Sequence, residues 1–261
     1  MSSLLDASPT SVMEVLRGER ASRPSADSSS AASLRAVLED SLLGVLGTAT
    51  RTEPVTVRAS SFRAPYSSGE GASALGSLRG ILISQALRLL CARVEVTDVY
   101  RDALVAWRAE AGENYLSRYL AQLDAEDTAR LRADVEAHWV TLRRSLGPLS
   151  HWWLPRTSLR AYQRLGAGRV ILRDMVDLMV GTTASDAASV VLLDVTTAAL
   201  DEGAERIMRY HALVQTLRTG TVPLRTSIFS TGTGQLWCSD VSGETLVRSA
   251  HEVVDVVREL A

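Results

Sequence analysis

Two aspartates at the ends of apolar segments are the residues of this sequence best suited to chemistry. Asp177 ends the apolar part of 169–180, and Asp194 follows the run Val190–Leu193, with a turn expected at 181–184. If these segments are neighbouring strands, the two carboxylates can hold a hard divalent ion such as Mg²⁺ between them. Such an ion polarises a phosphate and lowers the pKa of a bound water. The spacing therefore predicts a metal site.

The groups that usually assist such a metal are missing or replaced. All 28 basic residues are arginine, so no step that needs a lysine ammonium can take place here. Thr196, two residues beyond Asp194, is expected to bond local backbone groups. His211 falls on the inner face of an expected helix, where a packed, hydrogen-bonded histidine is the simpler interpretation and a ligand the alternative. Asp177 and Asp194 also have simpler interpretations, as a residue at the end of a strand and as a carboxylate bonded to a threonine or N–H.

A second candidate site is a stretch rich in arginine. Between Thr141 and Arg173 there are seven arginines and no acid, interleaved with aromatic side chains. Arginines on one surface contact phosphates, and exposed rings stack on unpaired bases. The alternative is a solvated strand face that pairs with the acidic run Asp124–Glu136. The candidate nucleic-acid-binding residues are Arg156, Arg160, Arg164, Arg169 and Arg173.

The elements that must position these residues divide the chain into three parts. Residues 1–33, rich in Ser and Ala, are expected to be a flexible N-terminal segment. Residues 34–150 are expected to be a mostly helical region packing on the core, with a partly alternating segment at 53–61 that favours a short strand. Residues 151–261 are expected to form the core in the order β-β-β-α-β-β-α. The fold class is therefore α/β (α+β), with a mixed sheet flanked by helices.

The core segments resemble the RecB-like nucleases of the PD-(D/E)xK superfamily. Residues 171–178 are similar to the first-strand motif, which ends in an aspartate, and residues 190–197 are similar to the second motif, hydrophobic-D-x-K-T. The resemblance runs from about Trp153 to Ala261. It implies a restriction-endonuclease-like core, with Asp177 and Asp194 as ligands of Mg²⁺ or Mn²⁺ and DNA as the substrate.

Departures from the family pattern predict a degenerate site. Thr196 stands where the family has its lysine, and His211 and Ile207 stand where its helix has tyrosine and glutamine. Ser84, four residues after Gly80, replaces the histidine of an earlier helix motif. Threonine carries no charge, and losing one positioned donor or charge typically costs about 10²–10³ in rate.

Three functions are compatible with these observations. The leading expectation is a catalytically degenerate nuclease-fold protein that binds DNA or a DNA-processing partner such as a helicase, as an accessory subunit in DNA processing or defence. The second is an active Mg²⁺- or Mn²⁺-dependent nuclease, in which Arg173 or Arg209 does the work of the lysine. The third is a protein–protein scaffold without nucleic-acid binding, which the net charge of −2 allows.

The sequence also bears on compartment. Cys91 and Cys238 form no C-x-x-C pair, which argues against a zinc site, an iron–sulfur cluster or a disulfide framework. Residues 1–21 lack the pattern of a secretory signal, and the most apolar stretch, 81–90, is too short to span a bilayer. A soluble cytoplasmic protein that does not contact a membrane is expected.

Overall fold

The computed structural model describes residues 12–17, 28–47, 53–62, 74–147, 149–182 and 189–261. The helices are α1 (Val12–Arg17), α2 (Ser28–Leu46), α3 (Ala74–Cys91), α4 (Val99–Ala111), α5 (Tyr115–Gln122), α6 (Ala125–Leu146), α7 (Glu202–Thr219) and α8 (Gly243–Leu260), with 3-10 turns η1 (Ala59–Phe62) and η2 (His151–Trp153). The strands are β1 (Val55–Arg58), β2 (Arg156–Leu165), β3 (Val170–Val180), β4 (Val191–Thr196), β5 (Arg225–Ser230) and β6 (Leu236–Asp240).

All six strands form one mixed sheet in the order β1-β3-β4-β5-β6, with β2 also paired to β3. β2 runs antiparallel along nearly all of β3, from Arg156 opposite Met179 to Leu165 opposite Val170. β1 and β4 therefore share the second edge of β3. β1 pairs in parallel with its start, and β4 pairs antiparallel with its end. The expected fold class, a mixed sheet flanked by helices, is confirmed, as is the expected element order after residue 151.

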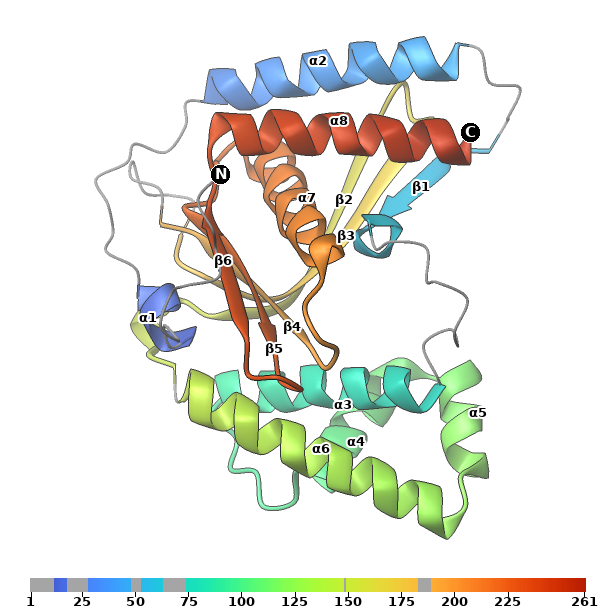
Figure 1. The fold of residues 1–261 in the computed structure, drawn as a ribbon, viewed down its shortest axis with the longest axis vertical. Helices are drawn as coiled ribbons and strands as arrows, with labels where there is room; N and C mark the ends of the chain where they lie inside the picture. Colours follow the sequence, from blue (N-terminus) through green and yellow to red (C-terminus); the bar gives the residue numbers. More distant parts are fainter. Residues whose placement is uncertain (1–11, 18–27, 48–52, 63–73, 148, 183–188) are drawn as a thin grey trace.

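Helices gather in two groups, one at each end of the molecule (Figure 1). α7 packs on the sheet, α8 packs on α7, and α2 lies along the outside of α8. At the other end α3, α4, α5 and α6 pack together below the sheet in the view of Figure 1. The apolar core has two main clusters for this reason: one joins α2, α7 and α8 to β1–β3, and the other joins α3–α6 to β3–β5.

The sheet draws on residues from both sides of the boundary expected at 150. Val55–Arg58 pair with Val170–Arg173, so β1 is a strand of the core sheet although about 115 residues separate the partners. Residues 28–33, placed by the sequence in a flexible segment, instead begin α2, where Ala31 is buried. Residues 1–11 and 18–27 of the expected flexible segment, and residues 183–184 of the expected turn, lie outside the described residues.

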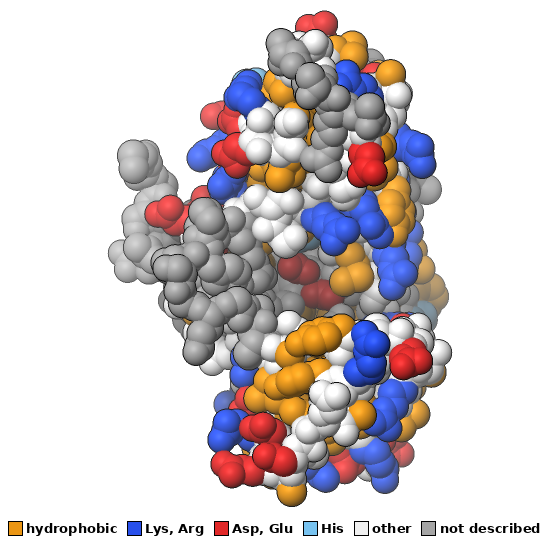
Figure 2. All heavy atoms as spheres, turned by 90° about the vertical axis from the view of Figure 1, so that its right-hand side faces the viewer, with side chains coloured by type: hydrophobic (Ala, Val, Ile, Leu, Met, Phe, Trp, Pro, Cys, Tyr) orange, Lys and Arg blue, Asp and Glu red, His pale blue; other side chains and the backbone are white. Residues whose placement is uncertain are grey.

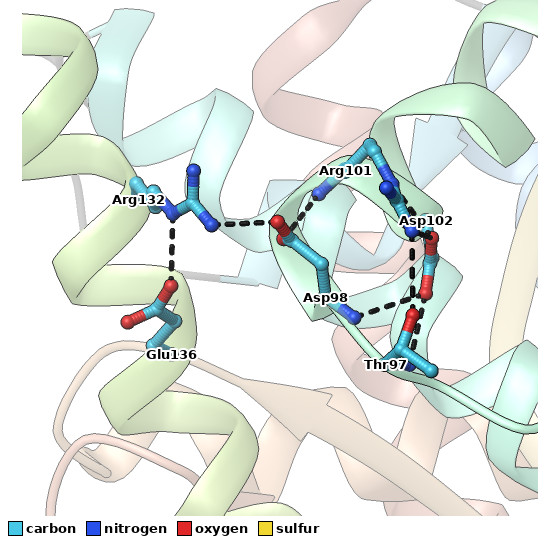
Figure 3. Close-up of polar contacts among 6 residues, drawn as sticks. All are labelled: Thr97, Asp98, Arg101, Asp102, Arg132 and Glu136. Atoms are coloured by element: carbon cyan, nitrogen blue, oxygen red, sulfur yellow. Dashed lines mark hydrogen bonds and ion pairs between the residues drawn. The ribbon is translucent and has the colours of Figure 1, made fainter.

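A polar network fixes the start of α4 against α6 (Figure 3). Asp98 is the N-cap of α4, and its Oδ1 accepts a hydrogen bond from the Arg101 N–H at 3.0 Å. Arg132 of α6 donates from Nη2 to Asp98 Oδ2 at 2.6 Å and from Nε to Glu136 at 3.0 Å. Because a capping carboxylate satisfies a free N–H of the first turn, Asp98 both begins α4 and holds it to α6.

α3 is the one helix in the described part of the chain that is long and apolar enough to cross a membrane, judged by length and composition. Its apolar side chains Leu78, Leu82, Ile83, Ala86 and Leu87 are buried in the cluster formed with α4 and α6. Packing inside the protein therefore accounts for these five side chains of the helix.

Gly181 ends β3 in a conformation that requires glycine. Its φ is +93°, and a Cβ at this position would collide with the carbonyl of Ser189. The Gly181 N–H donates to the Trp153 carbonyl at 2.7 Å, and its own carbonyl accepts from Arg156 at 3.0 Å. The close approach of Gly181 to the backbone of Ser189 and Trp153 sets where β3 ends, shortly after Asp177.

Candidate functional site

Asp177 is buried near the end of β3, with 6% of its surface exposed. Ser84 of α3 donates to its Oδ1 at 2.9 Å, and the Val195 N–H of β4 donates to its Oδ2 at 2.9 Å. Burial raises the pKa of Asp177, and the charge of Asp194 and a hydrogen bond with it raise this pKa further. The bonds from Val195 and Ser84 oppose the shift only in part. Asp177 therefore holds its proton at pH values where most aspartates have lost theirs.

His211 of α7 lies between two further carboxylates and is only 2% exposed. Its Nδ1 is 2.8 and 3.0 Å from the two carboxylate oxygens of Asp174, on β3. Its Nε2 is 3.7 Å from Asp194 Oδ2, beyond hydrogen-bond distance, and has no hydrogen-bond partner among the described residues. Burial lowers the pKa of His211, but the charge and hydrogen bonds of Asp174, together with the nearby charge of Asp194, outweigh burial and raise this pKa well above the usual value.

Asp194 is the most accessible acid of the group, with a side chain 20% exposed. Its strand, β4, lies between β3 and β5. The Asp194 carboxylate therefore lies beside Asp177, and its Oδ2 is 3.7 Å from His211 Nε2 of α7. The structure thus brings together Asp177, Asp194 and His211, the residues singled out from the sequence, and adds Asp174 and Ser84. We refer to these five residues as the acidic cluster.

Thr196, at the position of the family's lysine, bonds to local backbone. Its hydroxyl accepts from the Ala198 N–H at 3.2 Å, and its carbonyl accepts from the N–H and hydroxyl of Thr231 at 2.8 and 3.0 Å. Tyr210, next to His211, is fully buried, with its hydroxyl 3.0 Å from the carbonyls of Val57 and Arg173. The Tyr210 hydroxyl thus links α7 to β1 and β3, and the Thr196 carbonyl links the end of β4 to Thr231.

The two arginines considered as substitutes for lysine make their contacts outside the acidic cluster. Arg209 bonds to Glu252 at 2.6 and 3.2 Å and also pairs with Glu205. The Arg173 guanidinium lies over the ring of Tyr162, 5.2 Å from its centroid, and donates to the Tyr162 hydroxyl at 3.4 Å. Neither contact directs a guanidinium into the acidic cluster.

Most of the candidate arginines lie on an exposed part of β2 and β3. Arg160, Tyr162 and Arg164 alternate along β2 and so lie on one face of the sheet. Arg173 lies directly opposite Tyr162 on β3, and all four of these side chains are exposed. We call these four residues the arginine face. Arg156 is also exposed, at the start of β2, whereas Arg169 is only partly exposed, in the turn before β3.

The acidic run that was the alternative partner for these arginines is engaged elsewhere. Its ion pairs are made with Arg79 of α3 and with Arg130 and Arg132 of α6 itself. Among the described residues, no arginine of the arginine face forms an ion pair with a carboxylate. Glu110 of α4 interacts with Arg160 at longer range, since the charge of Arg160 helps to lower the pKa of Glu110.

One side of the molecule is hollowed between its two helical groups (Figure 2). Acidic side chains lie at the floor of the hollow, and arginine and hydrophobic side chains border it. Within the described ranges, no group of three or more His, Cys, Asp or Glu side chains is arranged to hold a metal ion. The one orphaned polar atom of the acidic cluster is the His211 Nε2.

Sequence reasoning missed the part played by Asp174. The available signal was a second carboxylate three residues before Asp177 in an otherwise apolar strand, with a histidine on the following helix. A buried charge requires a partner, and His211 is the residue of that helix that meets Asp174. Ser84, at the position of the family's histidine, donates directly to Asp177.

Comparisons with known proteins place the chain in no family. No protein-family model matches it, and no curated protein matches it. One solved structure, described as "Crystal structure of SSO0001", is similar over 84% of each chain, with 9% sequence identity and a TM-score of 0.31. This likeness is too weak to support an argument about function.

Proposed function

We propose that this chain is a RecB-like, restriction-endonuclease-like protein that binds nucleic acid and does not cleave it. The observation that carries the proposal is the arginine face, where Arg160, Arg164 and Arg173 surround the exposed ring of Tyr162 without carboxylate partners among the described residues. Closely spaced guanidinium groups attract phosphates and release counterions. An exposed aromatic ring beside them offers a surface on which a base can stack.

The composition of the acidic cluster supports the absence of cleavage. In the resemblance, Asp177 and Asp194 would hold Mg²⁺ or Mn²⁺, which when bound polarises the phosphate and activates a water. The chain's own residues supply no ammonium, because Thr196 bonds to backbone and Arg209 pairs with Glu252. The protonated His211 is buried and bonded to Asp174, so a phosphate that approached the cluster would meet no lysine-like donor to stabilise its transition state.

A role as an accessory subunit follows from binding without cleavage. The family resemblance suggests a helicase or another DNA-processing enzyme as the partner, in the cytoplasm, in DNA processing or defence. In such an assembly the chain would position DNA for the catalytic subunit.

Salt-dependent DNA binding tests the proposal. Anisotropy of labelled single- and double-stranded DNA would be measured against salt concentration for the wild type and for Arg160→Ala/Arg164→Ala/Arg173→Ala. We expect wild-type affinity to fall steeply with salt, since each phosphate contact contributes about 0.7–0.9 to the slope of log affinity against log salt. The triple variant should lose about two to three units of that slope.

The matched control removes the same charge from exposed helical arginines, in Arg130→Ala/Arg248→Ala/Arg258→Ala. These side chains are 58–67% exposed and already pair with carboxylates. The control should bind like the wild type. If the wild type does not bind DNA at low salt, or if the control loses as much affinity as the arginine-face variant, the proposal is wrong and a protein–protein scaffold is favoured.

An active nuclease is the second candidate, because Asp177 and Asp194 do lie side by side. Cleavage of both DNA forms would be assayed in Mg²⁺ and Mn²⁺ for the wild type and for Asp177→Ala/Asp194→Ala. We expect no cleavage from either protein. Cleavage by the wild type that disappears in the double variant would establish catalysis without a lysine.

A further inference from the structure

The buried Nε2 of His211 marks an unused binding position in the acidic cluster. His211 is 98% buried, yet this nitrogen has no hydrogen-bond partner among the described residues. A buried polar atom left without a partner costs on the order of 1–3 kcal/mol. Such an atom is rare in folded proteins, and its position 3.7 Å from the Asp194 carboxylate points to a ligand that supplies the missing contact.

Asp174 holds the ring so that Nε2 faces this position. Both oxygens of Asp174 lie within 3.0 Å of Nδ1, so a proton on Nδ1 is donated to the carboxylate. A metal ion that binds Nε2 displaces the proton of that nitrogen, and the ring is then the neutral tautomer with Nδ1 protonated and the lone pair on Nε2. A carboxylate that bonds the second nitrogen of a histidine is the usual support of a histidine that binds a metal ion.

Asp194 supplies a second ligand in front of Nε2. Its Oδ2 is 3.7 Å from Nε2, and its side chain is 20% exposed, which leaves a route from solvent. Two ligand atoms of a tetrahedral ion, each at about 2.0–2.1 Å, lie about 3.3–3.4 Å apart. A shift of a few tenths of an ångström would therefore let one ion contact both atoms.

We propose that His211 Nε2 and the Asp194 carboxylate bind one divalent transition-metal ion of the Zn²⁺, Co²⁺ and Mn²⁺ class, in preference to Mg²⁺. Asp174 orients the histidine, and water fills the remaining positions. Imidazole nitrogen suits these ions, whereas Mg²⁺ is held by oxygen alone. The two positive charges of the ion offset the negative charges of Asp174 and Asp194. This site is independent of the arginine face and of whether the chain binds DNA.

Metal titration of the tag-free wild-type protein tests the site. Co²⁺ binding would be followed by its visible absorption, with Zn²⁺ and Mg²⁺ as competitors. We expect one Co²⁺ per chain, displaced by Zn²⁺ but not by an equal concentration of Mg²⁺. Electron spin-echo modulation of bound Mn²⁺ should show coupling to a histidine nitrogen. No Co²⁺ or Zn²⁺ binding by the wild type would overturn the proposal without any variant.

Variants assign the ligands, with circular dichroism as the check on folding. His211→Gln and Asp194→Asn should abolish one-to-one Co²⁺ binding, and Asp174→Asn should weaken it about 10–100-fold. His138→Gln is the control, since His138 is a partly buried histidine whose Nδ1 bonds Thr231 in a separate place. Binding lost in the control, or kept in folded Asp194→Asn, would contradict the site. If His211→Gln does not fold, the wild type decides: absence of histidine nitrogen coupling to bound Mn²⁺ in its spin-echo spectrum would contradict the site.

Discussion

At the scale of single residues, the sequence could indicate which groups matter but not how they bond. Asp177 and Asp194 stand out because a carboxylate in an apolar strand requires a partner or an ion. That Asp174 bonds His211, and that Ser84 reaches Asp177 from a helix about 90 residues earlier, depends on packing between distant elements. No local pattern encodes those contacts. The roles of these residues as metal ligands or catalytic groups stay predictions.

Ser84 should stabilise the fold through Asp177. Its hydroxyl donates to a carboxyl that is 6% exposed, so Ser84→Ala removes a bond that water cannot easily replace. We expect the free energy of unfolding to fall by about 1–3 kcal/mol, measured by urea denaturation. Ser41→Ala is the matched control, since Ser41 is also helical but bonds only the exposed Val37 carbonyl. A Ser84→Ala protein as stable as the control would show that Asp177 does not need this donor.

At the scale of elements, periodicity predicted most helices and strands but not how they assemble. The mostly helical region expected at 34–150 contains α3–α6, because apolar spacing and capping residues are local signals. The partly alternating segment at 53–61 does contain β1. Its parallel pairing with β3 could not be predicted, because nothing near either strand specifies a partner so far away in the chain.

The network of Figure 3 makes Asp98 the residue on which the junction of α4 and α6 depends. Asp98→Ala removes the N-cap of α4 and the bond to Arg132, so we expect it to cost about 1–2 kcal/mol of unfolding free energy. Asp98→Ser keeps a capping oxygen and should restore most of that stability. Thermal denaturation of both variants would be compared with Asp255→Ala, which removes an exposed pair on α8. Equal losses in the serine and alanine variants would show that the bond to Arg132, and not the cap, dominates.

At the scale of the whole molecule, total charge conceals how charge is distributed. The net charge of −2 gives no sign of a basic surface. In the structure, arginines of α3 and α6 pair with the acidic run 124–136, which leaves the arginine face without carboxylate partners among the described residues. Negative charge is instead concentrated inside, where Asp174 and Asp194 flank His211 and Asp177 adjoins Asp194. This internal charge links the stability of the molecule to pH.

The direction of that link follows from two raised pKa values. Burial and Asp194 raise the pKa of Asp177, and the carboxylates beside His211 raise its pKa despite burial. Both groups keep a proton in the folded protein at pH values where the unfolded chain has released it, above about pH 4 for an aspartate and about 6.5 for a histidine. Folded protein then binds more protons than unfolded protein, so stability falls as pH rises towards the folded-state pKa values.

We therefore expect the metal-free protein, with a chelator present, to lose stability as pH rises above about 6.5, where the unfolded chain has released both protons. Each such proton contributes up to about 1.4 kcal/mol per pH unit to the slope, which urea denaturation at several pH values would measure. Asp177→Asn keeps the shape of a protonated carboxyl but cannot titrate, so its slope should be shallower than that of the wild type. Asp255→Asn, on the exposed face of α8, should leave the slope unchanged. If stability instead stays level or rises above pH 6.5, the carboxylates of the acidic cluster are already ionised. Some other cation would then balance their negative charge.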